Sequence, residues 1–103
     1  MQVATGPRWS VGFADFLPPF THPGSTAWCD VAASCGLAVE HCDVEDLTWD
    51  FDSSSQFRHW CSVGFGAWTD RLPPGAAEAF VDDVVDAYEQ VSGAPGRFRF
   101  LQL

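Results

Sequence analysis

The three histidines are the side chains of this chain that could most readily exchange protons or bind a metal: His22, His41 and His59. They lie far apart in the sequence, and no HExxH pattern joins any two of them, so a metal site would depend wholly on tertiary geometry. The sequence therefore predicts no metal. His22 lies in the loop PPFTHPG, and loops often carry functional residues, which makes it a candidate substrate-binding residue. A solvated loop histidine is the alternative.

The four cysteines, Cys29, Cys35, Cys42 and Cys61, form no CxxC pair and no compact secreted framework. The N-terminus lacks the form of a signal peptide, and no apolar run approaches the length of a membrane span. We therefore expect a cytoplasmic protein whose cysteines are reduced and serve as small buried apolar side chains.

The acidic residues and glycines match no catalytic or nucleotide-binding motif. The run from Asp43 to Asp52 lacks the DxDxDG spacing of a calcium loop, and its carboxylates are expected to be solubilising, with Asp52 as a helix cap. Neither GxGxxG, GxxxxGK[ST] nor GxSxG occurs. No pair of carboxylates stands out for acid–base work. The catalytic residues are therefore unknown, and no cofactor-binding residue is assigned.

Aromatic residues provide the clearest functional signal. They make up 15% of the chain, more than a core of this size needs, which is typical of an apolar small-molecule pocket. Besides His22, the predicted substrate-binding residues are Trp9, Phe13, Phe16, Phe20, Trp60, Phe65 and Trp68. Ordinary packing of an aromatic core is the alternative interpretation.

Length and charge limit the organisation and the partners. A chain of 103 residues holds one domain at most, with one modest core. Fourteen acidic residues against five arginines give a formal charge of −9, and this charge repels phosphate backbones and anionic lipid. Nucleic acid and membranes are therefore not expected partners.

Residues 1–24 are predicted to be an irregular aromatic segment, because four prolines interrupt any long helix, with a short helical turn over Trp9–Phe16. A helix follows over Thr26–Cys35, with Ser25 as its N-cap. Its residues Trp28, Val31, Ala32 and Cys35 recur at the spacing of an inward face. Residues 37–44 are predicted to form a strand, and Leu47, Trp49 and Phe51 alternate as a second extended piece.

Two further helices and a last strand complete the prediction. One of four candidates in Asp52–Ser55 caps a helix that reaches Trp68, in which Gly64 and Gly66 indicate either a close approach by another group or a break. Residues 76–91 have the pattern of an amphipathic helix, and 97–103 that of a terminal strand. Two strands alone make a marginal sheet, so we expect the isolated chain to be poorly stable or to self-associate.

The order of these pieces resembles the C-terminal, substrate-capping part of class I S-adenosylmethionine-dependent methyltransferases of the trans-aconitate, juvenile hormone acid and malonyl-carrier types. The resemblance rests on the CGL turn, AVEHCDVED, the WDFDS stretch, AWTDRLP, FVDDVVDAY and GRFRFLQL. It implies an α/β fold: residues 25–103 would form the last two strands of a partial Rossmann-like sheet, with a two-helix cap inserted at 53–92 and the N-terminal cofactor-binding half lacking.

The resemblance implies a small apolar, aromatic or acyl substrate and S-adenosylmethionine as cofactor, although the chain alone is not expected to bind this cofactor. Three alternatives stay open. The chain is a fragment of an enzyme, or one subunit of a split methyltransferase completed by a cofactor-binding subunit, or a non-enzymatic small-molecule binding or protein-interaction module.

Overall fold

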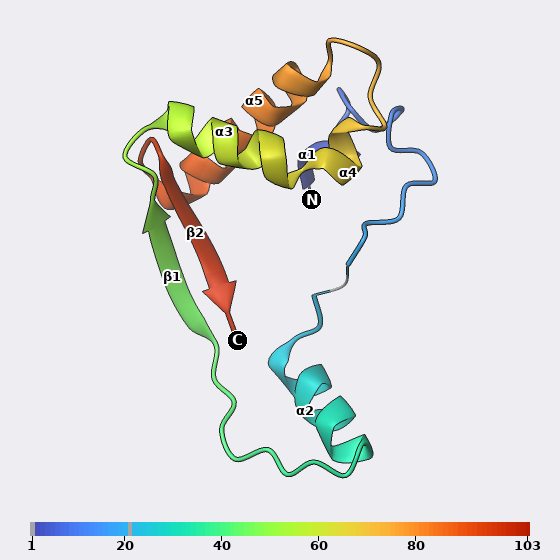
Figure 1. The fold of residues 1–103 in the computed structure, drawn as a ribbon, viewed down its shortest axis with the longest axis vertical. Coiled ribbons are helices and arrows are strands. Elements are labelled where there is room, and N and C mark those ends of the chain that lie inside the picture. The colour runs from blue at the N-terminus through green and yellow to red at the C-terminus, as the bar shows by residue number, and fades with distance from the viewer. Residues whose placement is uncertain (1, 21) are drawn as a thin grey trace.

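The computed structural model describes residues 2–20 and 22–103; Met1 and Thr21, both in the predicted segment 1–24, lie outside the described residues. Within that range the fold is a small mixed α/β domain of five helices and one two-stranded antiparallel sheet (Figure 1). In chain order, the elements are α1 (Gln2–Thr5), α2 (Ser25–Ser34), β1 (Glu45–Asp50), α3 (Ser54–Gly64), α4 (Gly66–Thr69), α5 (Ala77–Ser92) and β2 (Arg97–Gln102).

The two strands pair in a register that separates an aromatic face from a charged face. Trp49 lies opposite Phe98 and Leu47 opposite Phe100, whereas Asp50 lies opposite Arg97 on the other face. The aromatic face is directed toward α3 and α5, because Phe98 contacts both Phe57 and Tyr88 at ring-centroid distances of 5.6 and 5.0 Å. The alternation predicted for the terminal strand is confirmed, and the second extended piece is β1.

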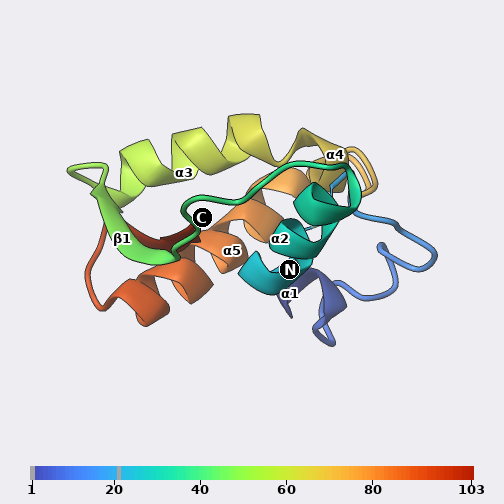
Figure 2. The ribbon, with the colours of Figure 1, turned by 90° about the horizontal axis from the view of Figure 1, so that it is seen from below.

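The core lies between α3, α4 and α5. Phe57 and Cys61, which lie four residues apart on one face of α3, pack against Val81 and Val85 of α5. A second buried cluster joins four residues from α1, α4 and α5: Ala4, Trp68, Phe80 and Val84. The amphipathic helix predicted over 76–91 is confirmed as α5, in which Phe80, Val81, Val84 and Val85 are buried and Val91 is exposed. Figure 2 shows α3 and α5 as neighbouring helices.

The predicted helix to Trp68 is interrupted. Helix α3 ends at Gly64 and α4 starts at Gly66, with Phe65 between them at φ −103° and ψ 25°. A Cβ on either glycine would meet no atom within 4 Å. A close approach by another part of the backbone is therefore wrong at these glycines, and the predicted alternative of a local break near Gly66 is confirmed. Of the four cap candidates, Ser53 accepts the hydrogen bond from the Gln56 amide, so the predicted cap role of Asp52 is also wrong.

The N-terminal segment forms consecutive turns, as expected for Trp9–Phe16, with backbone hydrogen bonds such as Gly12 N–H to Trp9 C=O at 3.0 Å. Polar contacts fasten the segment to the helices. The Trp9 indole N–H donates to Asp83 at 2.6 Å, and the Arg8 guanidinium donates to the same carboxylate at 2.9 and 3.0 Å. Arg71 donates to the Ala14 carbonyl at 2.8 Å.

Helix α2 lies apart from this core. The predicted cap role of Ser25 is wrong, because Ser25 is the first residue of the helix and Gly24 precedes it without a side-chain cap. No residue of α2 is buried, and Trp28 and Val31 are 50% and 56% exposed, so the predicted inward face covers nothing large. Residues 37–44 form no strand. The physical reason for 37–44 is that the described sheet has only two strands and leaves no further strand for these residues to pair with.

The outlying position of α2 makes the chain open rather than tightly packed (Figure 1). Its radius of gyration is 16.5 Å, against about 13 Å for a compact domain of this length. The prediction that the cysteines are buried is confirmed only for Cys61. It is wrong for the other three, because Cys29 and Cys42 are partly exposed and Cys35 is exposed. No helix within the described residues is long and apolar enough to cross a membrane.

Candidate functional site

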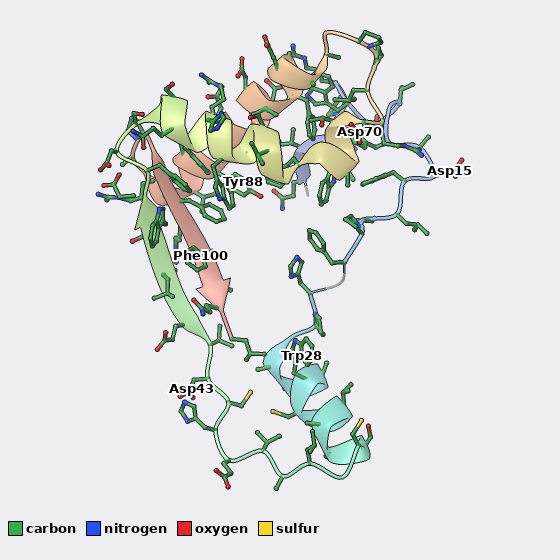
Figure 3. All side chains as sticks on the ribbon, in the orientation of Figure 1. Asp15, Trp28, Asp43, Asp70, Tyr88 and Phe100 are labelled. Atoms are coloured by element: carbon green, nitrogen blue, oxygen red, sulfur yellow. The ribbon has the colours of Figure 1, made fainter. Side chains whose placement is uncertain are left out.

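An aromatic groove runs along the inner face of the two strands. Its volume is about 490 Å³, and its lining consists only of aromatic side chains from β1, the residue after β1, α3 and β2: Trp49, Phe51, Trp60, Phe98 and Phe100. We call these five residues the aromatic groove. Figure 3 shows Phe100 on β2 and Tyr88 in the helical layer above it. A surface of this kind offers flat, apolar contacts to a ligand.

The walls of the groove are held by ring contacts. Trp60 of α3 lies 5.4 Å from Phe51 and 5.7 Å from Phe98, measured between ring centroids. Phe51 is stacked on the buried Phe57 at 5.0 Å with an interplanar angle of 11°. Phe98 is in turn stacked on Phe100 at 5.4 Å. The groove is therefore anchored on the core of the domain.

The outer rings remain accessible to solvent. Trp49 is 60% exposed and Trp60 is 46% exposed, although each offers a large apolar surface. Complete burial of such a ring removes roughly 150–250 Å² from water. A ligand that covers these two rings would therefore gain free energy from the hydrophobic effect without first displacing other side chains.

The groove contains no group that could transfer a proton, because its lining consists of tryptophan and phenylalanine alone. Two titratable groups, on α3 and α5, lie next to the groove. Burial raises the pKa of the Cys61 thiol to about 12. Burial, and secondly the neighbouring Cys61, raises the pKa of the Tyr88 hydroxyl. Both groups stay protonated at pH 7, and neither lines the groove, so the lining itself offers a ligand apolar contacts.

Of the eight residues predicted to bind substrate, Trp60 alone lines the aromatic groove. Phe65 links it to the remaining aromatic residues, with ring-centroid distances of 6.5 Å to Trp60 and 5.5 Å to the buried Trp68. Phe16 and Phe20 each lie 5.7 Å from Trp68. These rings form a continuous wall of packed side chains beside the groove.

The other three predicted residues lie at the ends of this wall. Trp9 and Phe13 pack on Phe80 of α5 at 5.4 and 5.2 Å, within the core cluster. His22 is exposed and contacts Phe20 edge to face at 5.1 Å. His41 and His59 are also exposed, and His41 forms an ion pair with Asp43 at 3.0 Å.

Sequence reasoning missed four of the groove residues: Trp49, Phe51, Phe98 and Phe100. Their alternation in the two extended segments is visible in the sequence, but alternation alone does not distinguish a face that packs on a core from one that stays partly open. The pairing of the two strands brings the four rings together, and this pairing joins residues that are distant in the sequence.

No group of three or more His, Cys, Asp or Glu side chains within the described residues is arranged to hold a metal ion. Comparison with known proteins gave no match to a protein-family model, to a curated protein or to a solved structure.

Proposed function

We propose that the chain binds a small, uncharged, apolar ligand in the aromatic groove. The observation that carries this proposal is the groove itself: five aromatic side chains and no charged one line a hollow of about 490 Å³. Because the rings are wide and flat, an aromatic ring or an acyl chain fits this surface better than a sugar or a phosphate ester does. The formal charge of −9 further disfavours anionic ligands.

We further propose that this binding region is the substrate side of an S-adenosylmethionine-dependent methyltransferase. Two features support the idea, in addition to the sequence resemblance. The strands β1 and β2 are antiparallel, and the helices α3, α4 and α5 are inserted between them along the chain. This order agrees with a last strand pair that carries a helical cap, although the penultimate strand would be Glu45–Asp50 rather than residues 37–44.

The residues of this chain do not fit S-adenosylmethionine. The resemblance implies a glycine-rich loop directly after a strand, but Gly64 and Gly66 lie on α3 and α4, and neither follows a strand. The cofactor would therefore bind to residues outside this sequence, either elsewhere in the same protein or in a separate subunit. We derive no chemical step that passes through it.

A non-enzymatic binding or interaction module is the second candidate. The observation that favours it is the absence of any titratable side chain from the lining of the groove. Under this alternative the same ligand would be bound and released unchanged. The unpaired edges of the two-stranded sheet would also suit self-association or a partner subunit.

One measurement tests where the cofactor binds, and a second separates the two candidates. Calorimetric titration of the purified chain with S-adenosylmethionine should show no binding, and micromolar affinity would contradict our assignment of the cofactor to other residues. The coding DNA that flanks this sequence should encode a glycine-rich loop after a strand, in frame or in an adjacent gene. If neither is present, the methyltransferase proposal fails and the binding module remains.

The ligand class is tested independently of the cofactor. β-Naphthol represents a planar aromatic ligand, and the octanoyl thioester of N-acetylcysteamine represents an acyl chain. Tryptophan fluorescence should change in a saturable manner with at least one of them. A flat titration with both compounds would contradict ligand binding in the groove.

A further inference from the structure

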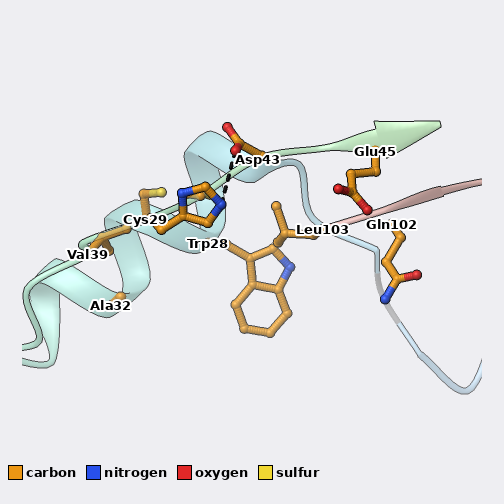
Figure 4. Close-up of a pocket in the computed structure, with 10 residues that line it drawn as sticks. Trp28, Cys29, Ala32, Val39, Asp43, Glu45, Gln102 and Leu103 are labelled. Atoms are coloured by element: carbon orange, nitrogen blue, oxygen red, sulfur yellow. Dashed lines mark ion pairs between the residues drawn. The ribbon is translucent and has the colours of Figure 1, made fainter.

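A second pocket lies between α2, the stretch that follows it, and the outer ends of both strands. Its volume is about 450 Å³. Cys29 lines it from α2, and Cys42 lines it from the following stretch. Figure 4 shows Cys29, Val39 and Asp43 around this pocket, with Leu103 on the side of β2. Two thiols from separate segments of the chain therefore lie in the wall of one pocket.

The position of Cys42 can be defined more closely. Its sulfur lies 4.0 Å from the carbonyl oxygen of Ser25, the first residue of α2. In an α-helix the carbonyl of one residue points toward the amide four positions later, which for Ser25 is the amide of Cys29. The Cys42 thiol is thus seated on the first turn of α2, beside Cys29. The neighbouring Cys29 thiol, and secondly burial, raises the pKa of the Cys42 thiol, in agreement with the proximity of the two side chains in one pocket wall.

Little else holds residues 38–44 against the helix. Within the described residues, the backbone of 38–44 forms no hydrogen bond to another backbone group. Cys29 and Cys42 are both partly exposed, so a small oxidant can reach them. Cys61 is buried in the core and is not accessible in this way. Cys35 is exposed, but it does not line the pocket that Cys29 and Cys42 share.

We propose that Cys29 and Cys42 form a redox site that closes to an intramolecular disulfide under oxidation and fastens residues 37–44 to α2. With hydrogen peroxide as the oxidant, one thiolate attacks a peroxide oxygen and hydroxide leaves, which gives a sulfenic acid. The second thiolate attacks that sulfur, the S–S bond forms, and the sulfenic oxygen leaves as hydroxide. Together the two thiols and one peroxide give one disulfide and two waters. The site is independent of the aromatic groove.

The test uses the full chain, reduced, desalted and dilute, treated with hydrogen peroxide and then with N-ethylmaleimide to block the remaining thiols. Peptide mass spectrometry should find a linkage between Cys29 and Cys42, with the loss of two hydrogen atoms. The linked fraction should be about ten-fold larger in the native protein than in urea, because only the fold brings the two thiols together. Amide hydrogen exchange within residues 37–44 should slow after oxidation.

Three serine variants serve as controls. Cys29→Ser and Cys42→Ser should each abolish the linkage, whereas Cys35→Ser should preserve it. None of these positions is buried, so the far-UV circular dichroism of all three variants should match that of the parent. The proposal is overturned if native Cys29 and Cys42 both remain fully alkylated while the oxidant consumes Cys35, or if their linkage forms no more readily in the native protein than in urea.

Discussion

Gly96 and Ser53 approach so closely that a Cβ atom on Gly96 would lie 2.7 Å from the carbonyl carbon of Ser53. Gly96 is also at φ 71°, in the left-handed region. Its carbonyl accepts a hydrogen bond from the Phe51 amide at 2.8 Å, and its amide donates to the Glu89 carboxylate at 2.9 Å. The Ser54 hydroxyl donates to the same carboxylate. This contact therefore joins the ends of α5 and β1 to the starts of α3 and β2.

The Gly96→Ala variant should be strongly destabilised. The added methyl group would collide with backbone atoms that cannot move away without displacing the N-terminus of α3. The left-handed backbone conformation of Gly96 is also unfavourable for alanine, which lowers stability further. We expect the free energy of unfolding to fall by about 3 kcal/mol, as measured by urea denaturation.

Gly93→Ala is the matched control for this variant. Gly93 is also left-handed, at φ 78°, but a Cβ there would meet no atom within 4 Å. The free energy of unfolding of Gly93→Ala should therefore fall by only about 1 kcal/mol, because the left-handed backbone conformation alone opposes the alanine. Equal losses in the two variants would contradict the close contact between Gly96 and Ser53.

The hydrogen bond from Trp9 to Asp83 should stabilise the N-terminal segment on α5. Trp9→Phe keeps an aromatic ring against Phe80 but removes the indole N–H, which leaves the Asp83 carboxylate with Arg8 alone. We expect a loss of about 1–2 kcal/mol in thermal or urea unfolding, since the acceptor is charged. Trp28→Phe, on the exposed α2, should change stability by less than about 0.5 kcal/mol. Similar losses of stability in Trp9→Phe and Trp28→Phe would be evidence against a stabilising hydrogen bond from Trp9 to Asp83.

The charged face of the sheet predicts a pH effect. The Arg99 guanidinium hydrogen-bonds Asp46 and lowers the pKa of that carboxyl below its usual 3.8. Because the folded-state pKa is depressed, the pair stabilises the fold above pH 3.8, and this contribution is lost as the pH falls through the depressed value. Asp46→Asn should therefore weaken the dependence of stability on pH in this acidic range. Unfolding curves at neutral and acidic pH that shift equally in both proteins would contradict this.

Cys61 should be chemically silent in the folded protein. Burial raises its pKa to about 12, so it stays a neutral thiol up to strongly alkaline pH. In a variant with Cys29, Cys35 and Cys42 replaced by serine, an aromatic disulfide reagent should react only at the rate of unfolding. Stability should fall as the pH rises above the ordinary thiol value of 9.0, because only the unfolded thiol ionises there. Rapid labelling under native conditions would show that Cys61 is accessible.

Local patterns in the sequence predicted α2, α5, the start of α3 and the last strand, whereas α1 lies in the segment 1–24 that was predicted to be irregular. The apolar spacing of α5, the serines before α3 and the alternation in β2 are all short-range signals that tertiary contacts reinforce. Residues 37–44 have the apolar and β-branched composition of a strand, yet a strand requires a partner that the described chain does not give them. Helix α2 likewise has regularly spaced apolar residues, but no other part of the described chain buries them.

The candidate site was predicted only in part. The sequence identified Trp60, but its remaining aromatic choices became the packed wall around Trp68 and Phe80. Which rings of an aromatic-rich chain stay open depends on long-range strand pairing and on what covers the sheet. The local sequence pattern around Trp49 or Phe98 reveals neither the strand pairing nor what covers the sheet.

The most direct test of ligand binding in the aromatic groove is a titration with β-naphthol, followed by nuclear magnetic resonance of the tryptophan indole signals. We expect the signals of Trp49 and Trp60 to shift with a dissociation constant on the order of 100 μM, and that of Trp28 to stay unchanged. Trp49→Leu should weaken binding about ten-fold, and Trp28→Leu, which replaces a half-exposed ring outside the groove, should not. Saturable shifts confined to Trp28, or equal affinity in both variants, would contradict the account.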